Sequence, residues 1–210
     1  MPMKGDMTKE RCFAATKYEL LHRQPRGGHC HASALHMLLD DVIFAMKLVT
    51  LQPLLVAGTL LGAFRNGTII RWTRDVDLLY NKTAFDGTVD RLAQELEALG
   101  YNLFFHEIWR VCINSAHPLA SNIFHVDRCA TASKSYDGSD VPYLDLYAFT
   151  QNVAGAVLMQ AVAEPLQFAD VFPTRAIEIL GKQYETIADP AAYFRAVKYS
   201  DVMTEINTGN

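Results

Sequence analysis

The sequence predicts a single domain of the α/β or α+β class, and three observations lead to this fold class. The chain has 210 residues, which suits one domain with enough interior to bury a sizeable core. Hydrophobic residues make up 50% and charged residues 20%, a balance that excludes wholesale disorder. Apolar residues follow helical spacing in some segments and short strand-like runs in others, with no internal repeat or linker between them.

The composition also limits the partners and the location of the chain. The formal net charge of −4 argues against a nucleic-acid polymer, whose binding needs a basic face. It leaves room for a small phosphate-bearing ligand held by an arginine or a metal ion. The longest apolar stretch, residues 48–64, is interrupted by polar residues, proline and glycine, so we expect no membrane span. Residues 1–10 lack the apolar segment of a signal peptide, and we expect a soluble chain, cytoplasmic as written.

The cysteines predict neither a zinc site nor a disulfide scaffold. No pair has C-x-x-C spacing, and the cysteine density is low for a disulfide-stabilised fold, which favours free thiols. These thiols would be Cys12, Cys30, Cys112 and Cys129. Cys30 lies between His29 and His31, where we favour a loop or the start of a helix over the alternative of a metal site.

The first helix is predicted from an apolar stripe over residues 35–49. Ser33 is expected to be its N-cap, because a serine hydroxyl can accept a hydrogen bond from a backbone N–H group of the first turn. His36 and Asp40 stand one helical turn apart, and we expect them to pair on the surface. Pro53 ends this segment.

A short buried strand is expected at residues 54–57, followed directly by a short helix. Gly58 allows a tight turn out of the strand, and Thr59 is expected to cap the helix. Asn66 and Gly67 form a strong turn signal. Beyond this turn, residues 73–80 have the pattern of a strand that carries acidic residues at its start.

The middle of the chain predicts a helix, a hairpin and a long loop. Apolar residues form one stripe over residues 85–99, and Gly100 supplies a helix stop. Two strand candidates follow at residues 101–106 and 109–114, with the spacing of a hairpin. Residues 115–140 are polar and rich in serine, aspartate and glycine, which indicates a long loop or insert.

The last third predicts two further strands and a final helix. Residues 141–149 read as a strand in which Asp145 is the one acid among apolar neighbours. A polar, strand-like piece lies near residues 181–187. The final helix, residues 190–202, begins behind Asp189 as N-cap and carries Pro190 at its first position.

Asp75 and Asp77 are the first candidates for a functional site. Side chains two positions apart on a strand point to the same face, roughly 6–7 Å from each other. Two carboxylates at that spacing can share a hard divalent cation, although an isolated D-x-D sequence is more often a solvated strand end. Asp145 needs a partner within its apolar strand, and a position next to the Asp75 strand would bring three carboxylates together.

The segment before these acids adds the elements of a phosphate site. Backbone N–H groups at a helix that starts near Gly58 and Thr59 favour a phosphate group. Arg65, one to two turns further on, can pair with an anionic oxygen. Together with a cation on the carboxylates, these groups are the equipment for phosphoryl transfer, in which catalysis consists mostly of positioning and charge neutralisation.

These residues carry a resemblance to a known family. The run AGTLLGAFRNG at residues 57–67, then the I-R-W at 70–72 and the D-V-D at 75–77, resembles the signature of the LicD family. The strand around Asp145 resembles the family's later strand, which bears a third acid, and the similarity extends over residues 34–203. The family includes bacterial phosphocholine transferases and the fukutins. It belongs to the nucleotidyltransferase-fold superfamily, which implies a mixed β-sheet flanked by helices.

The resemblance implies a catalytic domain at residues 34–210 behind an N-terminal extension at residues 1–33. It implies a metal-dependent transferase that moves phosphocholine or ribitol phosphate from a CDP-linked donor to a glycan hydroxyl and releases CMP. By this resemblance, Asp75 and Asp77 bind Mg²⁺ or Mn²⁺, and Asp145 completes the site or acts as the base for the acceptor. The residues expected to bind the donor are Gly58, Thr59, Arg65, Trp72, Arg74 and Arg110.

One departure from the family pattern keeps two other hypotheses open. Thr73 and Arg74 stand where the family has two more aspartates, so a degenerate member that binds a ligand without turnover is one alternative. The other is a nucleotidyltransferase that moves NMP from NTP to a small molecule or protein with the same acids. Residues 115–140 are expected to shape the acceptor site. Eukaryotic relatives work in the Golgi lumen, which would apply here if the chain belongs to a longer or anchored protein.

Overall fold

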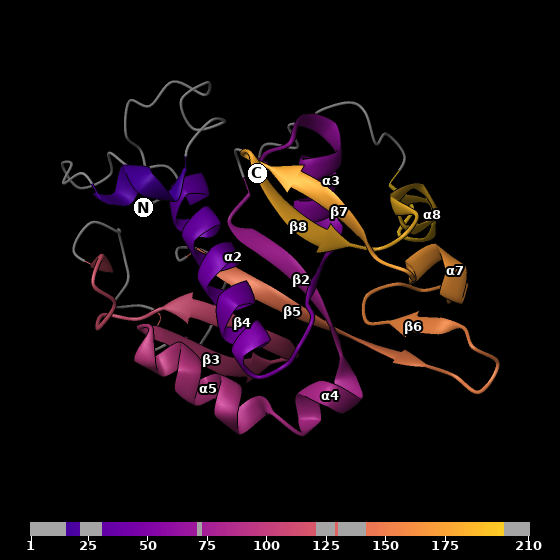
Figure 1. Cartoon of the computed structure of the whole chain (residues 1–210), viewed down its shortest axis with the longest axis horizontal. Helices are drawn as coiled ribbons and strands as arrows, with labels where there is room; N and C mark the ends of the chain where they lie inside the picture. Colours follow the sequence, from indigo (N-terminus) through magenta and orange to yellow (C-terminus); the bar gives the residue numbers. More distant parts are fainter. Residues whose placement is uncertain (1–15, 22–30, 71–72, 121–128, 130–141, 200–210) are drawn as a thin grey trace.

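The computed structural model describes residues 16–21, 31–70, 73–120, 129 and 142–199 of the 210-residue chain. These residues form one mixed β-sheet with helices packed against it (Figure 1). The helices are η1 (Lys17–Leu21), α2 (His31–Leu48), α3 (Ala57–Asn66), α4 (Lys82–Asp86), α5 (Val89–Ala98), α7 (Phe168–Val171) and α8 (Pro190–Ala196). The mixed sheet with flanking helices confirms the predicted fold class.

The described sheet has eight strands. They are β1 (Leu54–Leu55), β2 (Asp75–Asn81), β3 (Tyr101–His106), β4 (Ile108–Ile113), β5 (Tyr143–Gln151), β6 (Val157–Met159), β7 (Arg175–Ile179) and β8 (Lys182–Thr186). Their order is β3-β4-β5-β2-β1-β8-β7, and β6 pairs with β5 off this path. The central pair, β2 and β5, is parallel and places Asp77 directly opposite Asp145. Predicted strands at 73–80, 101–106, 109–114, 141–149 and 181–187 are confirmed, while β6 and β7 were not foreseen.

Helix α2 covers one face of the sheet and supplies much of the core. It packs against η1, α5 and the central strands, as Figure 1 shows. The helix begins at His31, so the prediction of Ser33 as N-cap is wrong: Ser33 lies inside the helix and is fully buried. The apolar stripe located this helix correctly, but the N-cap preference of serine did not mark its start, because such local preferences are weak enough for tertiary packing to override them.

The expected surface pair of His36 and Asp40 is also wrong, because both side chains are buried. Asp40 accepts hydrogen bonds from Lys182 at 2.7 Å and from the Tyr184 hydroxyl at 2.6 Å. The Nζ atom of Lys17 lies 2.5 Å from Oδ2 of Asp40. The backbone N–H of Lys17 donates a hydrogen bond to Nδ1 of His36. Asp40 therefore joins η1, α2 and β8, and sequence spacing could not show partners from such distant segments.

Helix α3 follows β1 after a single residue, Val56, which occupies the N-cap position. Thr59 is therefore not the N-cap that the sequence suggested; it lies in the first helical turn, and its hydroxyl bonds Asp77 instead. The turn predicted at the far end is confirmed, since Gly67 ends the helix in the left-handed conformation with φ +61°. Gly62 lies where the chain returns past the helix, and a Cβ atom there would be 2.4 Å from the carbonyl oxygen of Thr68.

The predicted helix over residues 85–99 is two helices, α4 and α5. Asn81 caps α4 by accepting the N–H of Ala84, and this helix ends before Gly87. Helix α5 then starts at Val89. The apolar stripe continues through both helices because both bury it in the same core, so periodicity alone concealed the break. Gly100 stops α5 with φ +87°, as predicted, and the hairpin of β3 and β4 follows.

A disulfide joins Cys112 on β4 to Cys129, with 5.8 Å between the two Cα atoms. The prediction of free thiols is therefore wrong for these two cysteines. The geometry of the fold decides such a bond, and cysteine density carries no information about it. Of the predicted insert, the structure describes residues 115–120 and Cys129; the remainder, and also Cys12, His29 and Cys30, lies outside the described residues.

Helix α8 begins as predicted, with Pro190 at its first position and Asp189 accepting the N–H groups of Ala191 and Ala192. It ends at Ala196, so the prediction of a helix to residue 202 is wrong: residues 197–199 are not helical, and Lys198 has a positive φ of 58°, which a helix does not continue through. Among the described helices, none is both long and apolar enough to span a bilayer.

The first prediction concerns Gly62. Replacing it with alanine should destabilise the protein by about 1–3 kcal/mol, because the added methyl group would collide with a backbone oxygen. This loss should occur even though alanine favours helix formation. The control is Gly87→Ala, because the Cβ atom at that position would meet nothing closer than 3.7 Å. Urea denaturation of both variants gives the comparison, and a Gly62→Ala protein as stable as the wild type would contradict the packing described.

Candidate active site

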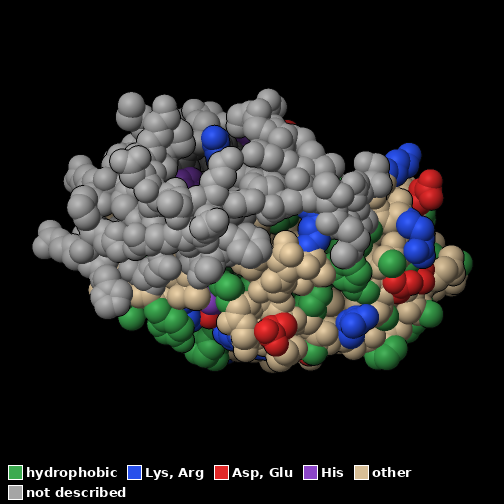
Figure 2. Space-filling model, turned by 90° about the horizontal axis from the view of Figure 1, so that it is seen from above, with side chains coloured by type: hydrophobic (Ala, Val, Ile, Leu, Met, Phe, Trp, Pro, Cys, Tyr) green, Lys and Arg blue, Asp and Glu red, His purple; other side chains and the backbone are tan. Residues whose placement is uncertain are grey.

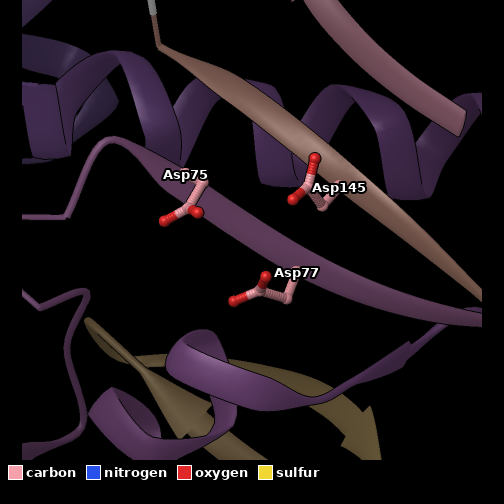
Figure 3. Close-up of side chains that lie close together, drawn as sticks. All are labelled: Asp75, Asp77 and Asp145. Atoms are coloured by element: carbon pink, nitrogen blue, oxygen red, sulfur yellow. The ribbon is translucent and has the colours of Figure 1, made fainter. Parts of the chain in front are cut away.

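Three carboxylates meet on one face of the central parallel strands. Asp75 and Asp77 lie two positions apart on β2, and Asp145 lies opposite Asp77 on β5. Figure 3 shows the three side chains grouped on the same side of these strands. One oxygen from each lies within 4.8 Å of the oxygens from the other two. The sequence predicted that these three carboxylates would meet if the two strands were neighbours, and this prediction is confirmed.

Asp77 is the most enclosed of the three and is held by the start of α3. Its side-chain oxygen Oδ2 accepts the backbone N–H of Thr59 at 3.2 Å and the Thr59 hydroxyl at 3.4 Å. In return, the backbone N–H of Asp77 donates to the Thr59 hydroxyl oxygen at 2.7 Å. Gly58 is packed close beside it, since a Cβ atom there would lie 3.4 Å from the same carboxylate oxygen. The glycine–threonine sequence thus fixes the α3 start against Asp77.

Asp75 is half-buried at the first position of β2. The Thr73 hydroxyl donates a hydrogen bond to its carboxylate, and the Tyr143 hydroxyl donates another at 3.5 Å. Tyr143 is the register partner of Asp75 on β5, so the strand pairing itself brings this hydroxyl to the acid.

Asp145 is paired with Arg110, which lies directly opposite on the antiparallel strand β4. The guanidinium Nε donates to Oδ1 of Asp145 at 2.8 Å, and Nη1 donates to the carbonyl oxygen of His106 at 2.5 Å. The guanidinium also lies over the ring of Tyr143, 5.7 Å from its centroid. The Tyr147 hydroxyl donates to the other carboxylate oxygen of Asp145 at 3.4 Å. Arg110 thereby fixes the carboxylate through one of its two oxygens.

The electrostatics of this acidic triad favour a bound cation. Burial, together with the nearby charges of Asp75 and Asp145, raises the pKa of Asp77 well above its usual range, although bonds from Thr59 oppose the shift. Burial also raises the pKa of Asp145 to about 6, while Arg110 acts in the opposite direction. Three ionised carboxylates carry more negative charge than the Arg110 guanidinium offsets, and two of them, Asp77 and Asp145, are buried. An all-oxygen ligand set of this kind fits a hard divalent cation, which would relieve that excess.

Several tyrosines that were not predicted from the sequence lie around the triad. Tyr147 shares a face with Asp145 because the two are separated by one residue on a strand, and that alternation was a usable signal. The Tyr193 hydroxyl of α8 accepts the N–H of Ala57 at 3.1 Å, next to the start of α3. Burial and the negative charges of Asp77 and Asp75 raise the pKa of Tyr199. No local pattern connects the last two residues to the acids, since only the folded chain brings α8 to them.

The other residues predicted to bind the donor differ in how directly they contact the triad. Arg65 is half-buried in the last turn of α3, and its charge acts on Tyr199. Arg74 immediately precedes Asp75, and its carbonyl oxygen accepts the backbone N–H of Tyr143. Arg110 is brought to the triad as the partner of Asp145. Trp72 lies outside the described residues.

A second prediction follows from the raised pKa values. In metal-free protein, the folded state holds protons on Asp77 and Asp145 more tightly than the unfolded chain does, so stability falls as the pH rises above the unfolded pKa. Asp77→Asn should therefore raise the free energy of unfolding near pH 7 by about 1–3 kcal/mol in a chelator, because asparagine is uncharged and can still accept the Thr59 N–H.

Urea denaturation of wild type and variant measures this effect, with the exposed Asp90→Asn as the control. The gain should shrink as the pH is lowered to about 4, where the wild-type carboxyl takes up a proton. A variant that is less stable than the wild type at neutral pH in chelator would refute the repulsion described.

A third prediction concerns the buried ion pair, whose side chains are 12% and 6% exposed. Arg110→Met should cost about 3–5 kcal/mol near pH 7, because it leaves the Asp145 charge buried without its partner. Adding Asp145→Asn to that variant should restore most of the loss. Lys82→Met is the matched control, since it breaks an exposed pair with Asp86 and should change stability by less than about 1 kcal/mol. Equal losses in both single variants would show that Asp145 does not depend on Arg110.

Comparison with known proteins places this site in a family context. Residues 51–185 match the family described as LicD/FKTN/FKRP, nucleotidyltransferase domain. The match contains the start of α3 and all three acids of the triad, and it is narrower than the span of 34–203 over which the sequence shows resemblance. A search of curated proteins finds no match. Because the match covers more than half of the 210 residues, the chain belongs to the LicD/FKTN/FKRP nucleotidyltransferase-domain family.

Proposed function

We propose that the protein is a divalent-cation-dependent transferase that moves a phospho-alcohol group from a CDP-linked donor to a glycan hydroxyl. The transferred group would be of the phosphocholine or ribitol-phosphate type, and CMP would be released. The observation that carries this proposal is the group of Asp75, Asp77 and Asp145, whose oxygens approach one another within 4.8 Å in a chain of this family. A nucleotide-linked donor fits the family, and a buried acidic triad fits the cation that such a donor needs.

The reaction that we propose is a displacement at phosphorus. The acceptor hydroxyl oxygen forms a bond to the phosphorus that carries the alcohol, and the bond from that phosphorus to the bridging oxygen of the diphosphate breaks. CMP leaves with the bridging oxygen, and the hydroxyl proton passes to a base. Asp145 is the candidate for that base if it is not itself a ligand of the cation, and without a cation burial raises its pKa to about 6.

The three acids would hold Mg²⁺ or Mn²⁺, which when bound neutralises the charge of the diphosphate. Thr59 fixes Asp77, and Arg110 fixes Asp145, so each ligand is oriented before the donor arrives. The N–H and hydroxyl groups of Thr59 already donate hydrogen bonds to Asp77. We therefore propose that the backbone at Gly58, which has no side chain to obstruct a ligand, contacts the phosphate.

Three arginines are proposed to meet the charge of the donor. Arg65 and Arg74 lie at the end of α3 and beside Asp75, and both are half-buried. Arg110 is assigned first to Asp145, and any contact that it makes with the donor is secondary to that pairing. Trp72 remains a predicted donor contact from the sequence.

The structure gives a reason to favour an active enzyme over a degenerate binder. The departure from the family pattern at Thr73 and Arg74 raised the degenerate alternative, yet at the first of these positions the Thr73 hydroxyl donates to the carboxylate of Asp75. Thr73 thus supports a ligand of the proposed cation, and its presence leaves the acidic triad complete.

A fourth prediction tests the function. The full chain should release CMP from CDP-choline or CDP-ribitol in the presence of Mg²⁺ or Mn²⁺ and a glycan acceptor, and a chelator should abolish the release. Asp75→Asn should lower the rate at least about a hundredfold, because it removes a ligand of the cation. The control is Asp90→Asn, an exposed acid on α5, which should leave the rate unchanged.

The same assay separates the alternatives. Release of pyrophosphate from an NTP, with no CMP from either donor, would assign nucleotidyl transfer. Donor binding by calorimetry without turnover under any of these conditions would assign a degenerate binder. Folded protein that neither binds nor turns over any of the nucleotides would overturn the proposal.

A further inference from the structure

A second recess lies at the end of the sheet where β2 and β5 finish, away from the acidic triad. It is an open cleft of about 760 Å³, between the starts of β1 and α4 and the segments β6 and α7. Figure 1 shows α4, β6 and α7 at this end of the sheet. Its lining residues are Thr50, Leu51, Gln52, Leu54, Asn81, Thr83, Ala84, Phe149, Thr150, Gln151, Val157, Phe168, Phe172 and Thr174. This volume is within the range of about 300–1,000 Å³ that is usual for small-molecule sites.

The lining has an unusual chemical balance. None of its described side chains is charged, and half of them carry a hydroxyl or carboxamide group. Three phenylalanines contribute the aromatic surface: the ring of Phe172 lies 5.8 Å from that of Phe149 and 5.1 Å from that of Phe168. Phe168 is 48% exposed, so about half of this aromatic side chain is open to solvent at the cleft.

Several of the polar groups are not used within the described fold. Asn81 accepts an N–H of α4, and Gln151 donates to the Gly155 carbonyl oxygen. By contrast, the side chains of four lining residues make no hydrogen bond to any other described residue; these are Gln52, Thr83, Thr150 and Thr174. Each of them offers both donor and acceptor capacity. The cleft therefore combines aromatic faces with hydroxyl and amide groups that can bond a ligand.

We propose that this cleft binds a neutral carbohydrate. A sugar ring has apolar C–H faces that pack on an aromatic ring and hydroxyl groups that both donate and accept, which matches the lining on both counts. An ionised ligand would lose its hydration and find no opposite charge on the described walls. A purely apolar ligand would leave the hydroxyl and amide groups without hydrogen bonds, which is costly.

The cleft is separate from the acidic triad although both face the same side of the sheet. Asn81 follows Asp77 on β2 by four positions, and Phe149 follows Asp145 on β5 by the same interval, so these side chains share one face. Four strand residues correspond to about 13 Å. Carbohydrate binding here needs neither the cation nor the nucleotide, and it stands or fails independently of the transfer reaction proposed above.

A neighbouring hollow lengthens the cleft. It has a volume of about 580 Å³ and shares Thr50, Leu51, Gln52, Leu54 and Thr174 with the first. The charged residues Lys47 and Glu185 line this hollow and not the cleft, whose own described walls are uncharged. The two hollows together are large enough for more than one sugar unit. Oligosaccharides are therefore expected to bind more tightly than monosaccharides.

The fifth prediction is a binding experiment on the full chain in chelator without nucleotide. Saturation-transfer NMR would be recorded with methyl glycosides of glucose, galactose, mannose and N-acetylglucosamine, and with N-acetylneuraminic acid and glucosamine as charged sugars. At least one neutral glycoside should show transfer, and the charged sugars should show none or far less. Phe168→Ala should weaken the binding about tenfold, because it removes the exposed ring.

The matched control is Phe44→Ala, which removes a ring that is 55% exposed on α2 and lies outside the cleft, and which should leave binding unchanged. Thr83→Ala is a second variant at the cleft, and it should also weaken binding. It keeps the test decisive if Phe168→Ala does not fold. The proposal is overturned if no neutral glycoside binds the folded protein, if binding survives both cleft variants, or if charged sugars bind equally well. CMP release in the separate assay would be unaffected by any of these outcomes.

Discussion

Three like charges are brought together in the acidic triad, and the elements around it are arranged to hold them. Asp77 and Asp145 are only 5% and 4% exposed, and Asp75 stands beside them. Such a group is unfavourable without compensation, because each carboxylate loses hydration and repels the others. The fold compensates with a partner from a different element for each acid: the start of α3 for Asp77, strand β4 for Asp145, and a threonine and a tyrosine for Asp75. These supports hold the ligands in place but leave negative charge for a cation to neutralise.

The order of the sheet follows from the same requirement. The parallel pairing of β2 with β5 sets Asp77 opposite Asp145, and β4 must lie on the other side of β5 to deliver Arg110. Acidic and basic side chains are otherwise interspersed on the described part of the face shown in Figure 2, which agrees with the small net charge of −4. The binding of the proposed donor would thus depend on a local arrangement of charge.

Much of this site could be predicted from the sequence, because strand alternation and neighbouring positions carry the information. The i, i+2 spacing of Asp75 and Asp77, and the lone acid Asp145 in an apolar strand, were sufficient to propose a triad. The pairing of Arg110 with Asp145 could not be predicted from the sequence, since it depends on the register between β4 and β5. The same limit explains the disulfide and the buried partners of Asp40, which come from segments far apart in the chain. Local patterns located the elements, and the tertiary fold decided their partners.

The most direct test of the account is to locate a cation experimentally. Crystals of the full chain grown with Mn²⁺ would be measured for anomalous scattering at the manganese edge. The account predicts a peak about 2.0–2.3 Å from oxygens of Asp75, Asp77 and Asp145, and no such peak at this position in an Asp77→Asn variant. A well-ordered triad with no anomalous peak between the three carboxylates, at a manganese concentration that supports activity, would contradict it.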